Sequence, residues 1–178
     1  LLKPGGEMIF KQLQILKDQG LVNKIGVSAY IDNQLIKIID RFDIDIIQFP
    51  MNILDRRLFD NGLLNKIYSK GIEIHTRSIF LQGLLLMDHK KRPNQFERWS
   101  SLWKFWHEWL ADNKLSALEA TIRYMISIPE VSRVLVGVDN KDQLQKIINS
   151  IDGNLPSIPK ELSIDDTDLL NPGNWSNL

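Results

Sequence analysis

The sequence predicts an α/β protein built on a parallel sheet. Its 178 residues are enough for one ordinary domain. After an opening amphipathic helix, short apolar strands alternate with helices four times, which is typical of parallel strands joined by helical crossovers. Two architectures share this pattern, the open doubly wound sheet and the (β/α)8 barrel. Because no glycine-rich phosphate fingerprint follows a strand, we favour the barrel, of which four strands form half.

The first half of the chain carries a boundary signal for each expected element. Apolar residues at helical spacing over 8–16 predict a helix, and Gly20 is placed to end it. Asp32 is expected to cap a second helix, and Gly71 to close a third over 61–69. Short apolar runs predict buried strands at 24–28, 44–49 and 72–76.

A tryptophan stripe follows a polar loop at 89–94. Trp99, Trp103 and Trp106 recur at i, i+4 and i+7, which places them on one face of a helix. A stripe with helical spacing is more often core than a platform for a sugar or a partner protein. The side chains of Trp109 and Phe105 lie off this face, so they are the better candidates for a substrate or partner surface.

Capping signals bound the last two helices. Capping-box spacing occurs at Ser116–Glu119 and again at Asn140–Gln143. An apolar run between these helices predicts the fourth strand at 134–137. The organisation expected is a barrel half over 1–153 followed by an irregular tail over 154–178, which is rich in proline, aspartate and asparagine.

Composition narrows the classes of partner. Lysine plus arginine and aspartate plus glutamate number 22 each, so there is no electrostatic case for a nucleic acid or an anionic membrane. No apolar run reaches membrane-spanning length. Cysteine is absent and the three histidines lack ligand-like spacing, so no metal site is expected. The absence of cysteine permits a reducing compartment, and a cytoplasmic location is our expectation.

Four phrases resemble, in order, passages of the aldo/keto reductase family. They are LKDQGLVNKIGVSAY at 16–30, IDIIQFPMNILDRR at 44–57, GIEIHTRSIFLQGLLL at 71–86 and YMISIPEVSRVLVGVDNKDQLQKII at 124–148. The resemblance implies that the chain is the C-terminal half of a (β/α)8 TIM barrel, strands 5 to 8. It also implies an oxidoreductase that reduces an aldehyde or ketone by hydride transfer from NADP(H) or NAD(H).

The resemblance further implies residues that bind the nicotinamide end of the cofactor. Ser28 and Gln48 match the pair that holds the carboxamide, and Ala29 stands where relatives have an asparagine. Arg77 takes the place of an aromatic that stacks on the nicotinamide ring, which a guanidinium can also do. Pairing of Arg77 with a nearby carboxylate is the alternative. Ser78 matches a residue near the pyrophosphate.

The segment after the fourth strand resembles the family's adenosine-phosphate site. Gly137, Asp139, Asn140 and Gln143 match it, although Asn140 and Gln143 are equally explained by helix capping. Lys141 is the nearby cation, and the Asp139 carboxylate would repel a phosphate. The sequence therefore leaves NADP(H) against NAD(H) open.

The catalytic set of the family is not expected in this chain. Its Tyr, Lys, Asp and His lie on or after strands 2 to 4, so no catalytic residue is assigned, and Tyr30 is expected to pack. The sequence starts at Leu1, and its first methionine, Met8, falls inside an expected helix, so we expect a missing N-terminal half. The isolated chain is then expected to be inactive in carbonyl reduction.

Two other functions stay open at this point. A cofactor-binding or scaffolding module without catalysis would also explain binding residues that lack a catalytic set. An unrelated barrel, such as a lyase or an isomerase, is the third reading, because a fold alone does not establish a reaction. The identity of the substrate and the oligomeric state are not determined by these patterns.

Overall fold

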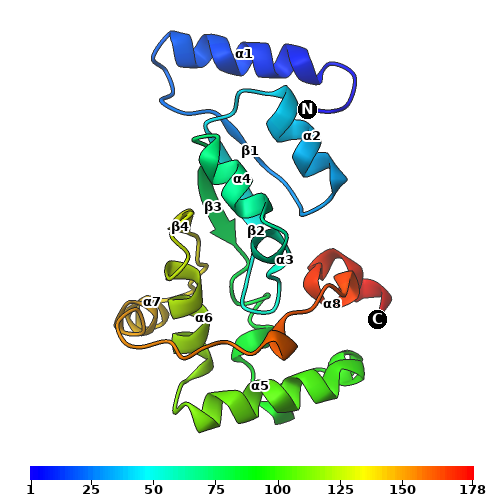
Figure 1. Cartoon of the computed structure of the whole chain (residues 1–178), viewed down its shortest axis with the longest axis vertical. Helices are drawn as coiled ribbons and strands as arrows, with labels where there is room; N and C mark the ends of the chain where they lie inside the picture. Colours follow the sequence, from blue (N-terminus) through cyan, green and yellow to red (C-terminus); the bar gives the residue numbers. More distant parts are fainter.

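The computed structural model describes residues 1–178, apart from the side chain of residue 177. Strands and helices alternate as expected (Figure 1). The strands are β1 (Gly26–Ser28), β2 (Ile46–Pro50), β3 (Glu73–Arg77) and β4 (Val131–Val134). The helices are α1 (Gly6–Asp18), α2 (Asn33–Arg41), α3 (Arg57–Asp60), α4 (Leu63–Ser69), α5 (Ser100–Asp112), α6 (Ala117–Ile126), α7 (Lys141–Asn149) and α8 (Thr167–Leu170). The 3-10 turns are η1 (Leu84–Leu86), η2 (His89–Lys91), η3 (Asn94–Trp99), η4 (Lys160–Leu162) and η5 (Pro172–Asn177).

The strands form one parallel sheet in the order β1-β2-β3-β4. A doubly wound sheet reverses its strand order at a switch point, whereas the wall of a barrel adds strands consecutively. The consecutive order therefore confirms the prediction of a parallel α/β sheet of the barrel type.

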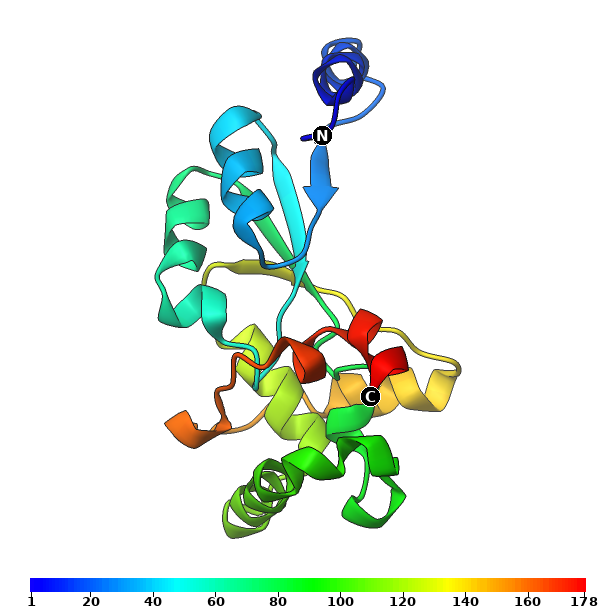
Figure 2. The same ribbon diagram turned by 90° about the vertical axis from the view of Figure 1, so that its right-hand side faces the viewer.

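The two faces of the sheet differ in chemistry. Residues in register across the strands, such as Val27, Ile47 and Ile74, point to the face that is packed, and the last two are fully buried. The next row, Ser28, Gln48 and His75, points the other way, because successive side chains alternate across a strand. Figures 1 and 2 show α2 and α4 on one side of the strands. The apolar row thus faces helices and the polar row does not.

Several predicted caps are confirmed. The Asp32 carboxylate accepts hydrogen bonds from the amides of Gln34 and Leu35 at 2.8 and 3.2 Å. Gly20 has a φ of 72° just after α1, a conformation that glycine adopts without strain. The capping box at the start of α6 is present in both directions, from Ser116 and from Glu119.

The tryptophan stripe is core, as predicted. Trp103 and Trp106 are buried, and their indole N–H groups donate to the carbonyls of Phe96 and Leu85 at 3.1 and 3.2 Å. The expectation that Trp109 forms a surface is wrong, because its ring is 7% exposed and stacks on Trp106 at 5.7 Å. Helix α5 contacts η2 and η3 and also η4 of the C-terminal segment, and Trp109 lies at the edge of the buried face rather than outside it. Phe105 is half-buried.

The first helix forms, but its apolar stripe is not covered. Met8 is 70% exposed and Ile9 59% exposed. Helix α1 instead packs through Phe10, whose ring lies 5.0 Å from that of Phe42. Figures 1 and 2 show α1 beyond the end of the sheet where the strands begin. Helical periodicity predicted the element correctly but not what lies against it.

The first three strands lie within two residues of their predicted bounds, and two further elements differ in ways that the structure explains. The fourth strand spans Val131–Val134, not 134–137. It begins earlier because a tight turn follows α6, in which the amide of Val131 donates to the carbonyl of Ile128, and the chain pairs with β3 immediately after this turn. Pairing with β3 ends at the Leu135 amide, which donates to Thr76 at 2.8 Å. The helix expected at 61–69 begins at Leu63, because Gly62 has a φ of 73° and separates it from α3.

The C-terminal segment contains short helical turns rather than being irregular throughout. It buries Leu162, Leu169 and Leu170. The amide of Ile164 donates to the carbonyl of Leu54 at 3.0 Å, which ties the segment to the chain after β2. In the part of the chain that the structure describes, every helix is too short or too polar to cross a bilayer.

An arginine anchors the loop that follows β3 to helix α5. The Arg92 guanidinium donates to the carbonyl of Met87 at 3.1 Å and lies 4.1 Å from the centre of the Trp103 ring. Its Nη2 is also 3.4 Å from Nε2 of His107. Only a neutral imidazole can accept this bond. Burial lowers the pKa of His107, and the charges of Arg92 and His89 lower it further, against a smaller opposing effect of Asp88.

This anchor predicts a stability that depends on pH. Because the pKa of His107 in the folded protein lies below 6.5, the unfolded chain takes up its proton first as the pH falls. The stabilisation is complete above about pH 6.5 and is lost as the pH falls through the folded value. Urea unfolding from pH 7 to pH 5 should show this loss, and His107→Gln, which keeps an acceptor that does not titrate, should flatten it. An unchanged slope in the variant would exclude the His107 anchor as the cause.

The buried stripe predicts a large effect of truncation. Trp106 is 0% exposed, so Trp106→Ala should lower the free energy of unfolding by about 3–5 kcal/mol through lost burial and a cavity. Tyr68→Ala, at a side chain that is 52% exposed, should change it by less than about 0.5 kcal/mol. Denaturant unfolding of both variants measures the difference, and equal losses would contradict the burial.

Candidate functional site

A cleft of about 720 Å³ lies between the loops that follow β3 and β4 and the side of α7. This volume falls within the range of small-molecule sites, roughly 300–1,000 Å³. Five of the predicted cofactor residues line it: Arg77, Ser78, Gly137, Asp139 and Gln143. In parallel barrels, sites form at the carboxyl ends of the strands, because the loops after successive strands converge there. The structure therefore brings most of the predicted set into one cavity.

The remaining predicted residues lie elsewhere. Ser28 and Gln48 are register partners on β1 and β2, and the Ser28 hydroxyl donates to Oε1 of Gln48 at 3.1 Å. This pair keeps the Gln48 amide nitrogen as a donor and the Ser28 oxygen as an acceptor, which is the complement of a carboxamide. Asn140 caps α7, and its side chain accepts from the amide of Gln143 at 2.9 Å.

The backbone of the loop after β3 is unusual. Ser78, Leu81 and Gln82 have φ values of 58°, 48° and 54°, in the left-handed region that side chains other than glycine rarely adopt. Each such residue costs of the order of 1–3 kcal/mol, and such residues gather at ligand sites. Ser78 and Gln82 both line the cleft. The strain thus falls on the segment that forms the wall of the cavity.

This loop also presents backbone donors. Among the described residues, the amides of Ile79, Phe80 and Gln82 donate no hydrogen bond, although the amides of Leu81 and Gly83 bond within the loop. Successive amides in a turn that mixes right- and left-handed residues form a concavity suited to an anion. The expected place of Ser78 near a pyrophosphate fits this arrangement.

In the part of the chain that the structure describes, Arg77 contacts an aromatic ring and not a carboxylate. Its guanidinium carbon lies 4.9 Å from the centre of the Tyr30 ring, a cation–π contact. Among the described residues, no carboxylate lies within ion-pair distance of Arg77. Tyr30 is 50% exposed, so its packing partner is this one guanidinium rather than the core.

Sequence reasoning missed Lys146. It named Lys141 as the nearby cation, but Lys146 lines the cleft and Lys141 does not. The signal was available, because Lys146 is three residues after Gln143 on the same helix and so shares its face. Asp139 is the carboxylate of the lining. Its carboxylate accepts a hydrogen bond from the side-chain Nε2 of Gln143 at 3.3 Å, and its backbone N–H donates to Oε1 of the same side chain at 2.8 Å.

The polar face of the sheet carries an ion-pair network beside Gln48. Glu73 accepts from Lys24 and from Nε2 of His75, the latter at 2.8 Å. Both contacts lower the pKa of Glu73, to about 2, and the hydrogen bond with His75 has the larger effect. Glu73 is therefore ionised at neutral pH and holds the imidazole next to Gln48 on β2. His75 is therefore a half-buried histidine with a hydrogen-bond partner on its own strand.

In the described part of the chain, no three histidines or carboxylates come close enough to hold an ion. Burial raises the pKa of Tyr124, so its phenol stays protonated over the physiological range.

The cleft and the loop beside it offer hydrogen-bond donors, the two cations Arg77 and Lys146 and a cavity, which together can bind a ligand that carries phosphate groups.

Fold and cleft together define a barrel-type α/β protein with a cavity at its strand ends, and comparison with known proteins identifies its family. The sequence profile of the aldo/keto reductase family matches residues 6–159. This chain therefore belongs to the aldo/keto reductase family. No curated protein matches it.

Solved structures agree on the fold. Aldo-keto reductase AKR11C1 from Bacillus halodurans in its apo form superposes with a TM-score of 0.70 at 21% identity, covering 88% of this chain and 54% of that one. Its holo form gives 0.64 at 19% identity, covering 86% and 53%. Glycerol dehydrogenase AKR11B4 from Gluconobacter oxydans gives 0.53 at 16% identity, covering 80% and 52%. The chain spans about half the length of these structures.

Proposed function

We propose that this chain supplies the cofactor-binding half of an oxidoreductase that reduces an aldehyde or ketone with NADP(H) or NAD(H). The observation that carries the proposal is the cleft, which gathers predicted cofactor residues from separate strand ends in a member of this family. The nicotinamide cofactor, when bound, supplies the hydride. A small-molecule carbonyl substrate, a cytoplasmic location and an N-terminal barrel half that completes the site belong to the same proposal.

The residues present fit such a cofactor. Ser28 and Gln48 offer the donor and acceptor that a carboxamide needs, and their mutual hydrogen bond orients both. The loop amides after Ser78 offer donors to a pyrophosphate. Arg77 and Lys146 add positive charge along the cleft. We propose that Arg77 borders the nicotinamide end and Lys146 the adenosine end.

The alternative is a cofactor-binding or scaffolding role without catalysis. It is favoured by one observation: the lining of the cleft offers binding groups but neither a tyrosine nor a histidine. Turnover of a test aldehyde with NADPH or NADH, measured on a protein in which an N-terminal barrel half is joined to this chain, distinguishes the two. Tryptophan fluorescence quenching by either cofactor without turnover would favour the binding module, and no quenching by either would exclude both.

The carboxamide assignment predicts a loss of affinity. Gln48→Ala should weaken NADPH and NADH binding by about tenfold, because a ligand group loses a hydrogen bond of about 1.4 kcal/mol. Gln34→Ala, at an exposed position of α2, is the matched control and should leave the affinity unchanged. Fluorescence titration measures both. An unaltered affinity in the Gln48 variant would overturn the assignment.

The charge at the far end of the cleft predicts a cofactor preference. Lys146→Ala should weaken NADPH binding about tenfold at low salt, while Lys141→Ala should not, because Lys141 lies outside the lining. A loss confined to NADPH places Lys146 at the 2′-phosphate, whereas an equal loss for NADH places it at a part common to both cofactors. A larger effect of the Lys141 variant would show that Lys141, the cation named from the sequence, binds the phosphate, and that the assignment of Lys146 from the cleft is wrong.

A further inference from the structure

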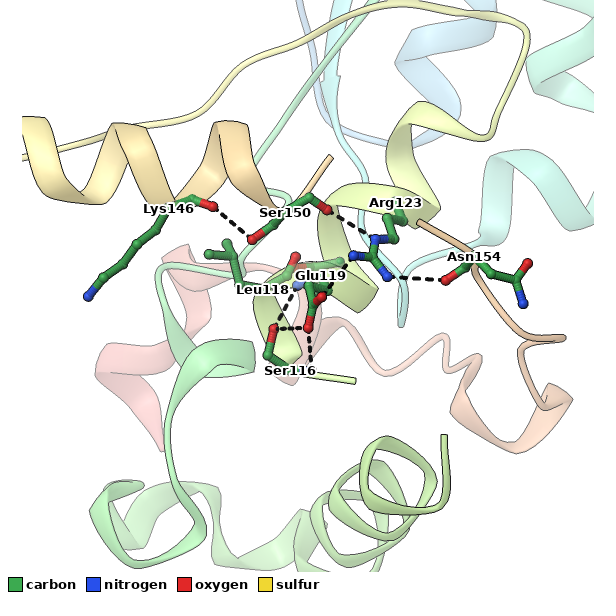
Figure 3. A network of polar contacts seen from close by, with 8 residues as sticks. Ser116, Leu118, Glu119, Arg123, Lys146, Ser150 and Asn154 are labelled. Carbon is green, nitrogen blue, oxygen red and sulfur yellow. Dashed lines mark hydrogen bonds and ion pairs between the residues drawn. The ribbon is translucent and has the colours of Figure 1, made fainter. Parts of the chain in front are cut away.

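A buried arginine joins the two helices behind the cleft. Arg123 lies on α6 and is 9% exposed. Its Nε donates to the carbonyl of Ser150 at 3.1 Å, its Nη1 to the carbonyl of Asn154 at 3.2 Å and its Nη2 to the Glu119 carboxylate at 2.8 Å (Figure 3). One planar group therefore contacts α6, the end of α7 and the start of the C-terminal segment.

The contact with Ser150 reaches the cleft through α7. Ser150 is the C-cap of that helix, and its hydroxyl donates to the carbonyl of Lys146 at 2.7 Å (Figure 3). Lys146 and Ile147 line the cleft from the last turns of α7, and Leu118 lines it from α6. Arg123 itself is not part of the lining. Its bonds thus fix the spacing of two helices whose opposite sides form the wall of the cavity.

Charge explains why the guanidinium is held there. Glu119 neutralises it from one turn earlier on α6, and Glu119 is in turn held by the capping box, in which the amide of Ser116 donates to it at 2.9 Å. This backbone bond is the main cause of the lowered pKa of Glu119, with Arg123 adding to it. A cation at the carboxyl end of α7 also opposes the negative end of the helix dipole.

The turn after α7 is shaped around this arginine. Gly153 has a φ of 128°, and a β-carbon built on it would lie 2.6 Å from Cζ of Arg123. A side chain at 153 would therefore displace the guanidinium from the carbonyls that it bonds. The glycine, the capping box and the arginine belong to one network of contacts that spans the sequence from 116 to 154.

We propose that Arg123 is a positioning residue for the cofactor cleft, holding α7 against α6 so that Lys146 and Ile147 face the ligand. The inference rests on the proposed function, since it assigns the cleft to a cofactor. It differs from a general contribution to stability, because it predicts an effect confined to the adenosine end, which α7 borders.

A matched pair of arginines separates the two roles. Arg56 is also 9% exposed and donates to a carbonyl of the C-terminal segment, that of Pro159 at 3.1 Å, but among the described residues it makes no hydrogen bond to α7. Titration of the full chain with ADP, the part common to both cofactors, should show about tenfold weaker binding in Arg123→Lys. Arg56→Lys should bind ADP within twofold of the unaltered protein.

A second measurement is independent of any ligand. Amide hydrogen exchange over 141–149 should accelerate about tenfold in Arg123→Lys, while exchange over 33–41 in α2 stays unchanged. Gly153→Ala should reproduce both effects, because it displaces the same guanidinium. Gly71→Ala is its control, since Gly71 also has a positive φ, of 77°, but has nothing within 4 Å of an added β-carbon.

The outcomes are distinct. Weaker ADP binding together with faster exchange in α7, in the Arg123 and Gly153 variants alone, supports the inference. Equal effects in the Arg56 or Gly71 variants, or none in the Arg123 variant, overturn it and leave the proposed function standing. If the unaltered chain does not bind ADP, the proposed function of the cleft fails. Exchange over 141–149 then reports only whether Arg123 holds α7, and its positioning role for a cofactor is overturned as well.

Discussion

Consecutive parallel pairing of the strands is the constraint on which the rest of the structure depends. Because β1 to β4 run in one direction and in sequence order, their carboxyl ends lie along one edge of the sheet. The loops after β3 and β4 therefore meet there and form the cleft. The same register places Ser28 beside Gln48 on neighbouring strands, although twenty residues separate them in the sequence.

Supports behind the cleft hold its walls in place. The loop after β3 adopts left-handed backbone at Ser78 and Gln82, which is costly unless surrounding contacts determine it. Arg92 supplies such contacts by bonding loop carbonyls and stacking on Trp103 of α5. On the other side, Arg123 ties α6 to α7. Neither arginine is part of the cavity lining, and we propose that both hold its walls, Arg123 from a buried position and Arg92 from a half-buried one.

Sequence patterns predicted those elements whose signals are local. Asp32, Gly20 and the Ser116–Glu119 box act on backbone groups within a few residues, so their effect could be read directly. Patterns failed where packing comes from elsewhere in the chain. Trp109 is buried because the C-terminal segment covers α5, and β4 is displaced because pairing with β3, not apolar content, determines where a strand begins.

By itself the sequence determined the parallel α/β class, the order of its elements and the identity of the groups able to bind a cofactor, since these depend on periodicity, capping and side-chain chemistry. Only the tertiary structure decided which residues share the cavity: Lys146, which the sequence patterns did not indicate, lines it, while Asn140, which they did indicate, caps a helix. It also decided that Arg77 rests on Tyr30. The physical reason is that helix orientation and loop path are set by long-range packing, which no local pattern contains.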